Sequence, residues 1–128
     1  MIVLGLGARS GAAVTAPVLA ALAGAGLTPA EVGVLATLDR RAAENRVRAL
    51  AGEYGWRLAG YPADVLAAQP VPNPGRAAAA AVGSPSVAEA AALLAAGPGA
   101  VLLLPKQARD GVTVAIAASR TPEASRNP

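Results

Sequence analysis

Short aliphatic runs recur along this chain between polar or glycine-rich breaks. The runs at residues 2–4, 32–37, 101–104 and 112–117 are rich in Val, Leu and Ile, which is typical of buried strands. A shorter run at residues 56–60 is assigned to an edge strand. The pattern therefore predicts a sheet whose strands are spread over the whole chain.

Apolar residues at helical spacing lie between several of these runs. The spacing predicts helices over residues 15–25 and 40–54. Ser86 and Glu89 have the spacing of a capping box, which predicts a third helix that ends near Ala96. Strands and helices thus alternate along most of the chain.

Shorter signals mark the turns. Residues 28–31 have capping-box form with proline at the first helical position, and they predict one short turn. Residues 62–66 predict one helical turn, and the proline- and glycine-rich residues 69–76 predict a loop. Residues 77–82 stay ambiguous, because alanine favours a helix wherever nothing opposes it.

Charged residues surround the start of the helix predicted over residues 40–54. Asp39 is expected to cap this helix. Glu44 lies four residues from Arg40 and four from Arg48, so we expect it to pair with them along an exposed helix face.

The last two strands differ from the others in how they are joined. Asp110 and Gly111 form a tight turn between them, which is too short for a helical crossover, so the two strands are expected to be antiparallel neighbours. We therefore predict an α/β fold: a single three-layer domain with a mixed, mostly parallel sheet that ends in an antiparallel C-terminal strand pair. The domain is assigned to residues 2–118, and residues 119–128 are expected to form a flexible C-terminal tail.

The residue types that are absent exclude several kinds of chemistry. The 128-residue chain contains no Cys and no His. Without them there is no thiolate nucleophile, no imidazole base and no zinc or iron site of the usual kind. Carboxylates alone could still coordinate magnesium, but the chain has only eight acidic residues, so we expect neither a metal nor a cofactor. Aromatic residues make up 2% of the chain, so the core must be built from Val, Leu, Ile and Ala.

Charge and hydropathy narrow the range of partners. The net charge is +3, but the arginines are scattered and no aromatic residues are interleaved for base stacking, so no nucleic-acid partner is expected. The uncharged stretch between Arg9 and Glu31 is rich in alanine and contains prolines and glycines, whereas a membrane span needs about 20 strongly apolar residues. We expect a cytoplasmic protein that makes no contact with a membrane.

The loop after the first strand is the first candidate site. Gly7, Arg9, Ser10 and Gly11 lie between a strand and a helix, where backbone N–H groups can bind an anion and an arginine adds a forked donor. These residues also fit a tight turn with a solvated arginine. A dinucleotide site is an alternative, but the glycine spacing is one residue off the G-x-G-x-x-G form.

The end of the second strand is the next candidate, because it lies beside that loop in a parallel sheet. Thr37, Asp39 and Arg41 are the polar residues there. Asp39 is the candidate catalytic residue, as a general base, or else an acceptor for a ligand. A plain helix cap also explains Asp39, and a solvated helix face also explains Arg41.

Two more candidates come from the second half of the chain. Ser84, Ser86 and Glu89 open a helix and offer a second carboxylate-binding terminus, although capping alone explains Ser86 and Glu89. Lys106, the only lysine, directly follows an apolar run. It fits either an anion-binding role or an ordinary exposed cation.

Taken in order, these segments resemble the CobE/CbiG C-terminal domain family of cobalamin (vitamin B12) biosynthesis. That family opens with a strand and a G-x-G-C/A-R-R/K/S-G loop, which residues 5–11 match. It continues with A-T-I/L-D-x-K-x-x-E, which residues 36–44 match except that Arg41 replaces the lysine.

The second half of the family pattern is present as well. A segment G-x-x-S-V-A/C-E-A-A-A is matched by residues 83–92. A lysine and the run V-T-V-A-I-A close the pattern, and Lys106 and residues 112–117 match them. The resemblance covers residues 2 to about 118, almost the whole chain.

The resemblance implies work on corrin-ring precursors. In the longer CbiG proteins this domain follows others in a hydrolase that opens the ring-A δ-lactone of cobalt-precorrin-5A and releases acetaldehyde. The chain is more like the stand-alone CobE form, so we expect a protein that binds or helps process a precorrin intermediate, together with other enzymes of the pathway. A hydrolase that uses Asp39 or Glu89 to activate water, and a nucleotide-binding α/β module, are the alternatives.

The chemistry of such a ligand suits the candidate residues. Corrinoid intermediates carry acetate and propionate groups around a flat apolar ring. Arg9, Arg41, Lys106 and two helix N-termini would bind those carboxylates. An alanine- and glycine-rich floor would let the ring approach the backbone. A chain without His or Cys is not expected to ligate cobalt.

Overall fold

A five-stranded sheet forms the centre of the protein, whose structure is a computed structural model that describes residues 1–9, 11–71 and 87–119. The strands are β1 (Ile2–Ala8), β2 (Val32–Leu38), β3 (Arg57–Tyr61), β4 (Val101–Arg109) and β5 (Val112–Ala118). Their order across the sheet is β3-β2-β1-β5-β4. Strands β1, β2 and β3 are parallel, whereas β5 runs antiparallel to both β1 and β4.

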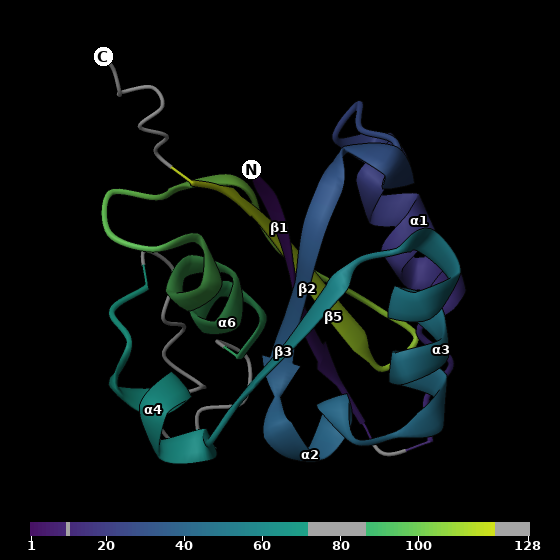
Figure 1. The fold of residues 1–128 in the computed structure, drawn as a ribbon, viewed down its shortest axis with the longest axis horizontal. Coiled ribbons are helices and arrows are strands. Elements are labelled where there is room, and N and C mark those ends of the chain that lie inside the picture. The colour runs from purple at the N-terminus through teal and green to yellow at the C-terminus, as the bar shows by residue number, and fades with distance from the viewer. Residues whose placement is uncertain (10, 72–86, 120–128) are drawn as a thin grey trace.

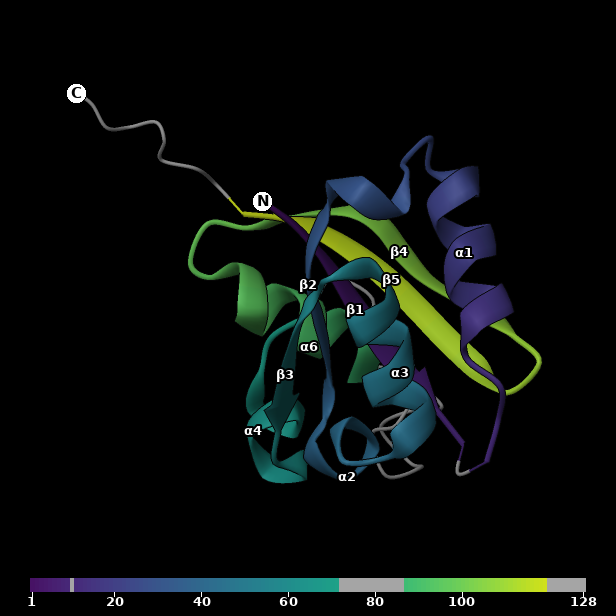
Figure 2. The same cartoon turned by 45° about the vertical axis from the view of Figure 1, so that its right-hand side comes forward.

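Helices cover both faces of this sheet. They are α1 (Thr15–Gly24), the 3-10 turn η1 (Pro29–Glu31), α2 (Asp39–Ala42), α3 (Asn45–Tyr54), α4 (Ala63–Ala68) and α6 (Val87–Ala96). Figure 1 shows α1 and α3 on one side of the sheet and α6 and α4 on the other, and Figure 2 shows β5 and β4 side by side at its edge. The predicted three-layer α/β fold with an antiparallel C-terminal strand pair is confirmed.

Most local signals in the sequence correspond to these elements. However, β1 extends to Ala8 and β4 to Arg109, so Gly5, Gly7 and Lys106 lie within strands and not after strand ends. The turn predicted at residues 28–31 is present, and the backbone N–H of Thr28 donates to Glu31 Oε1 at 2.8 Å. The helix predicted over residues 40–54 is instead divided into α2 and α3. At Glu44 the backbone is extended, with φ −79° and ψ 139°, so the helix cannot continue through it.

Two expectations about charged residues near this break are wrong. Asp39 is the first residue of α2 rather than its cap: the capping position is Leu38, and no side chain caps the helix there. Glu44 pairs with Arg41 and Arg46 instead of Arg40 and Arg48, because the break removes the continuous helix on which four-residue spacing would bring them together.

Several sequence expectations lie outside the described residues. They concern Ser10, Ser84 and Ser86, the run at residues 77–82, and all of the loop at residues 69–76 beyond Val71. The tail predicted at residues 119–128 is described only at Ser119, whose backbone N–H donates to the carbonyl of Met1 at 2.9 Å.

The two faces of the sheet are packed with side chains of very different size. Leu4, Leu6 and Ile116 belong to the core cluster that also contains residues of α1 and α3. The cluster under α6 contains Ala36 and Ala117 instead. Small residues on this face let helix and sheet approach closely, since interiors are packed without voids.

Helix α6 packs directly against the backbone of β1 at Gly5. A Cβ atom added at Gly5 would lie 1.9 Å from the carbonyl oxygen of Ala88, so only glycine fits there. Ala88, Ala90, Ala91 and Ala92 are completely buried in α6. These alanines and Gly5 therefore form a helix–sheet interface and are not an open floor for a flat ring.

Candidate functional site

The ends of the strands place the candidate residues at one edge of the sheet. In the pairing register Leu6 lies opposite Thr37, Leu38 opposite Tyr61 and Ala8 opposite Val112. The carboxyl ends of β1, β2 and β3 and the turn between β4 and β5 therefore lie at the same end of the strands, which we call the carboxyl edge of the sheet. Ligands of open α/β sheets bind at this edge.

The first turn of α6 also lies at the carboxyl edge. A Cβ atom at Gly7 would lie 3.6 Å from the Cβ of Val87 and 3.8 Å from the backbone nitrogen of Ala88. The end of β1 and the start of α6 are thus neighbours, and Gly7 lies within β1 and not in the loop that the sequence predicted. The positive end of the α6 dipole favours a negative charge here.

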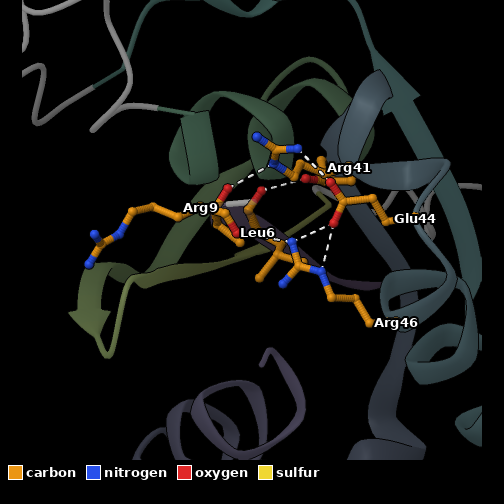
Figure 3. A network of polar contacts seen from close by, with 7 residues as sticks. Leu6, Arg9, Arg41, Glu44 and Arg46 are labelled. Atoms are coloured by element: carbon orange, nitrogen blue, oxygen red, sulfur yellow. Dashed lines mark hydrogen bonds and ion pairs between the residues drawn. The ribbon is translucent and has the colours of Figure 1, made fainter. Parts of the chain in front are cut away.

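Arg9 is exposed, and its side chain extends over the turn between β4 and β5. A Cβ atom at Gly111 would lie 3.0 Å from Arg9 Nε. The backbone N–H of Arg9 donates to the carbonyl of Gly111 at 3.1 Å. Figure 3 shows the guanidinium of Arg9 pointing away from that of Arg41. Arg9 is therefore a forked donor at the surface, beside the hairpin.

The loop after β1 uses part of its hydrogen-bonding capacity internally. The N–H of Ala12 donates to the carbonyl of Arg9 at 3.1 Å, and the N–H of Arg9 itself is bonded to Gly111. These two N–H groups are not available to an anion. Gly11 has φ +83°, the left-handed region in which a side chain is strained, so a glycine is required there.

A polar network of two arginines and one glutamate borders the end of β1 (Figure 3). Arg41 Nε donates to the carbonyl of Ala8 at 2.8 Å, and Arg41 Nη1 lies 2.5 Å from Glu44 Oε2. Arg46 Nε donates to Glu44 Oε1 at 2.6 Å, and Arg46 Nη2 donates to the carbonyl of Arg9 at 3.0 Å. The side chains of Arg41 and Glu44 are only 19% and 25% exposed, so they do not form the solvated helix face expected from the sequence.

Arg46 is a residue that sequence reasoning missed. It lies in the first turn of α3, inside the helix predicted over residues 40–54 but outside every candidate site that the sequence indicated. Its position two residues after Glu44 carries no signal while the helix is assumed to be continuous, because residues two apart on a helix do not face each other. The contact exists because the extended backbone at Glu44 turns its carboxylate toward both arginines.

The network changes the acidity of its carboxylate. The hydrogen bond from Arg46 holds the pKa of Glu44 below its ordinary value of 4.5, burial acts in the opposite direction, and Arg41 lowers the pKa further. Because the pKa of Glu44 is lower in the folded protein than in the unfolded chain, ionisation of this carboxylate stabilises the folded state.

A pH dependence of stability follows from this lowered pKa. Ionised Glu44 contributes stability above its unfolded pKa of about 4.5, and the contribution is lost as the pH falls through the lower, folded value. We expect Glu44→Gln to be less stable than the parent at neutral pH, with the difference narrowing below about pH 4.5. Thermal unfolding of both proteins at a series of pH values checks this. A difference that stays constant down to about pH 3 would show that the charge is not responsible.

Thr37 and Asp39 have different positions at the end of β2. Thr37 is completely buried, and its Oγ1 donates to the carbonyl of Leu6 at 2.7 Å, which joins β2 to β1. Asp39 is exposed at the start of α2. Of these two residues, Asp39 is therefore the one whose side chain is open to a ligand at the carboxyl edge.

Glu89 and Lys106 are brought together by an irregularity in β4. Leu104 lies opposite Ile116 but Gln107 lies opposite Val114, so β4 contains one extra residue between these pairs. Such a bulge interrupts the ladder of hydrogen bonds. The backbone N–H of Lys106 donates to Glu89 Oε2 at 3.0 Å, and Glu89 is completely buried. The carboxylate of Glu89 thus has a structural partner inside the protein.

Other kinds of site find little support in the described ranges. Among residues 1–9, 11–71 and 87–119, no group of three or more Asp and Glu is placed to hold a metal ion. None of the helices in these ranges has both the length and the apolar character needed to cross a bilayer. A hollow of about 410 Å³ lined by Leu93, Leu94 and Pro98 lies at the opposite end of α6 from Gly7.

The protein is therefore a three-layer α/β domain with several arginines at its carboxyl edge. The sequence matches the protein family described as Cobalamin synthesis G C-terminus over residues 2–117. The chain therefore belongs to this family and is a protein of cobalamin biosynthesis, which confirms the resemblance drawn from the sequence motifs.

Known relatives agree with this assignment. Protein CobE of Sinorhizobium sp is 37% identical over 108 residues, which cover 83% of this chain and 70% of that protein. The crystal structure of CobE, a protein from the cobalamin biosynthetic pathway, matches with a TM-score of 0.71 and 30% identity, over 91% of this chain and 89% of that one.

Two further solved structures share the fold. Cobalamin biosynthesis protein chiG from Agrobacterium tumefaciens str. C58 has a TM-score of 0.68 and 36% identity, over 94% of this chain and 100% of that chain. A cobalamin biosynthesis protein G homolog from Sulfolobus solfataricus has a TM-score of 0.70 and 22% identity, over 94% of this chain but 37% of that one. The last likeness shows the fold alone.

Proposed function

We propose that this protein binds a precorrin intermediate through its carboxylate groups at the carboxyl edge, as a carrier or as an accessory to another enzyme of the pathway. One observation carries the proposal. Arg41 and Arg46 share the single carboxylate of Glu44, so their network keeps a net positive charge at the end of β1. The exposed guanidinium of Arg9 adds a second positive charge at the same edge.

The chemistry of the ligand matches this edge. Precorrins carry acetate and propionate side chains around their ring, and a planar guanidinium binds a carboxylate with two parallel hydrogen bonds. The N-terminus of the ten-residue helix α6 adds a favourable dipole beside Gly7. An edge with these features selects a ligand with several carboxylates over a neutral ring.

Binding to a polycarboxylic corrin tests the proposal. We expect cobyrinic acid to bind and its fully esterified form to bind much more weakly, as followed by the visible spectrum of the corrin. Arg9→Ala removes a forked donor to a carboxylate, and a hydrogen bond to a charged group contributes about 1.5–3 kcal/mol, so affinity should fall on the order of tenfold to a hundredfold.

Arg57→Ala is the matched control for Arg9→Ala. Arg57 is also exposed, but it lies at the start of β3, at the amino ends of the parallel strands and so opposite the carboxyl edge. The control should bind like the parent. Equal losses in both variants would mean that only overall charge matters, and absence of binding by the parent would overturn the proposal.

The position of Asp39 favours a second candidate function. Asp39 is an exposed carboxylate at the carboxyl edge, where a general base for lactone opening would have to lie. The protein would then be a cobalt-precorrin-5A-type hydrolase. Acetaldehyde release from cobalt-precorrin-5A by the isolated protein, lost in Asp39→Asn, would favour this hydrolase over the binding protein.

A further inference from the structure

The network of Arg41, Glu44 and Arg46 holds two consecutive carbonyl groups of the chain. Arg41 Nε donates to the carbonyl of Ala8 at 2.8 Å, and Arg46 Nη2 donates to the carbonyl of Arg9 at 3.0 Å. Because each peptide group is planar, fixing its carbonyl oxygen also fixes the direction of the N–H on its other side. The network therefore sets the orientation of the backbone where β1 ends.

The carbonyl of Arg9 is shared between two donors. Besides Arg46 Nη2, it accepts the backbone N–H of Ala12 at 3.1 Å. On the other side, the N–H of Arg9 is held by the carbonyl of Gly111. The backbone of Arg9 is thus fixed between α3 and the turn of the β4–β5 hairpin, while its exposed side chain points away from the network (Figure 3).

The network of Arg41, Glu44 and Arg46 contains one more arginine than the stability of the fold alone would favour. Two guanidinium groups share one carboxylate, and Arg46 Nη1 is buried with no hydrogen-bond partner among residues 1–9, 11–71 and 87–119. A buried donor without a partner costs free energy, and in native proteins such groups call for an explanation. A single arginine paired with Glu44 would avoid this cost.

We propose that Arg46, held by Glu44, is a positioning residue for ligand binding, because it fixes the carbonyl of Arg9 and so directs the Arg9 guanidinium to the carboxylates of the ligand. This inference rests on the proposed function. Arg46 does not itself touch the ligand. It acts through the backbone of Arg9, and Glu44 fixes its guanidinium by accepting from Nε.

The test compares Arg46→Ala and Arg46→Lys with Arg48→Ala. Arg48 lies on the same helix and is exposed, so its replacement removes the same charge without a contact to the loop. The probe is cobyrinic acid, titrated against each folded variant, and the unfolding temperature of each variant is measured in parallel. In the protein without ligand, the hydrogen-exchange rate of the Ala12 amide is followed by NMR.

A positioning role predicts a specific set of results. Arg46→Ala should unfold at a lower temperature than the parent, because its ion pair with Glu44 is lost. Under conditions in which it is fully folded it should bind cobyrinic acid about tenfold more weakly, while Arg48→Ala binds like the parent. Arg46→Lys should remain impaired, because an ammonium group lacks the planar fork that reaches Glu44 and the Arg9 carbonyl together. The Ala12 amide should exchange faster in Arg46→Ala.

Other results would overturn the inference. Full affinity in Arg46→Lys would show that only charge matters, and equal losses in Arg46→Ala and Arg48→Ala would show the same. If Arg46→Ala does not fold, Arg46→Lys decides the question. Weak binding by Arg9→Ala but normal binding by both Arg46 variants would remove this inference, and ligand binding at the carboxyl edge would then rest on Arg9 and not on the charge of the network. Absence of binding by the parent would remove both this inference and the proposed function.

Discussion

Gly5→Ala is expected to destabilise the protein strongly or to prevent folding. The new Cβ would lie 1.9 Å from the carbonyl oxygen of Ala88 and 2.9 Å from the Cβ of Ala92. The first contact is with backbone, so no rotation of a side chain relieves it, and α6 would have to move away from the sheet. Overpacking of a core costs about 1–3 kcal/mol and occasionally more, and we expect about 3 kcal/mol or above.

Gly7→Ala is the matched control, two residues further along the same strand. A Cβ at Gly7 would meet its nearest neighbours at 3.6 Å and 3.8 Å, which is ordinary van der Waals contact. We expect this variant to lie within about 1 kcal/mol of the parent, with some gain from the lower entropy of its unfolded chain. Urea unfolding followed by circular dichroism measures both. Equal stability of the two variants would contradict the close contact of α6 with β1.

Glu89→Ala is expected to show the second large effect. Glu89 is completely buried and accepts the backbone N–H of Lys106, which the bulge in β4 separates from the regular ladder. Removal of the carboxylate takes the acceptor away from this part-buried N–H, and a buried donor that loses its acceptor costs about 1–3 kcal/mol in addition to the cavity. Urea unfolding of the variant gives the loss directly.

Glu89→Gln separates this structural role from a catalytic one. Glutamine keeps the volume and a carbonyl oxygen that can accept the N–H of Lys106, so we expect it to retain more stability than alanine. It would abolish any reaction in which Glu89 activates water, because an amide is not a general base. Equal stability of the alanine and glutamine variants would contradict the structural role.

The candidate site was predicted in part from the sequence. Residues that follow strands were placed at one edge because parallel strands end on the same side of a sheet, and the structure brings Gly7, Arg9 and Asp39 to that edge. The partners of Arg41 were not predicted, because they depend on the break at Glu44 and on the side chain of Arg41 reaching the carbonyl of Ala8 at the end of β1.

The order of elements along the chain could be predicted from the sequence, because strands, helices and tight turns have characteristic local patterns of residues. The family could be recognised as well, since its motifs are short and occur in a set order. Local patterns carry no information about distances between distant segments. The strand order β3-β2-β1-β5-β4, the contact of Ala88 with Gly5 and the meeting of Glu89 with Lys106 therefore emerged only from the folded chain. The two contacts of α6 depend on how closely this helix packs on the sheet, which is decided by the side chains of several elements together.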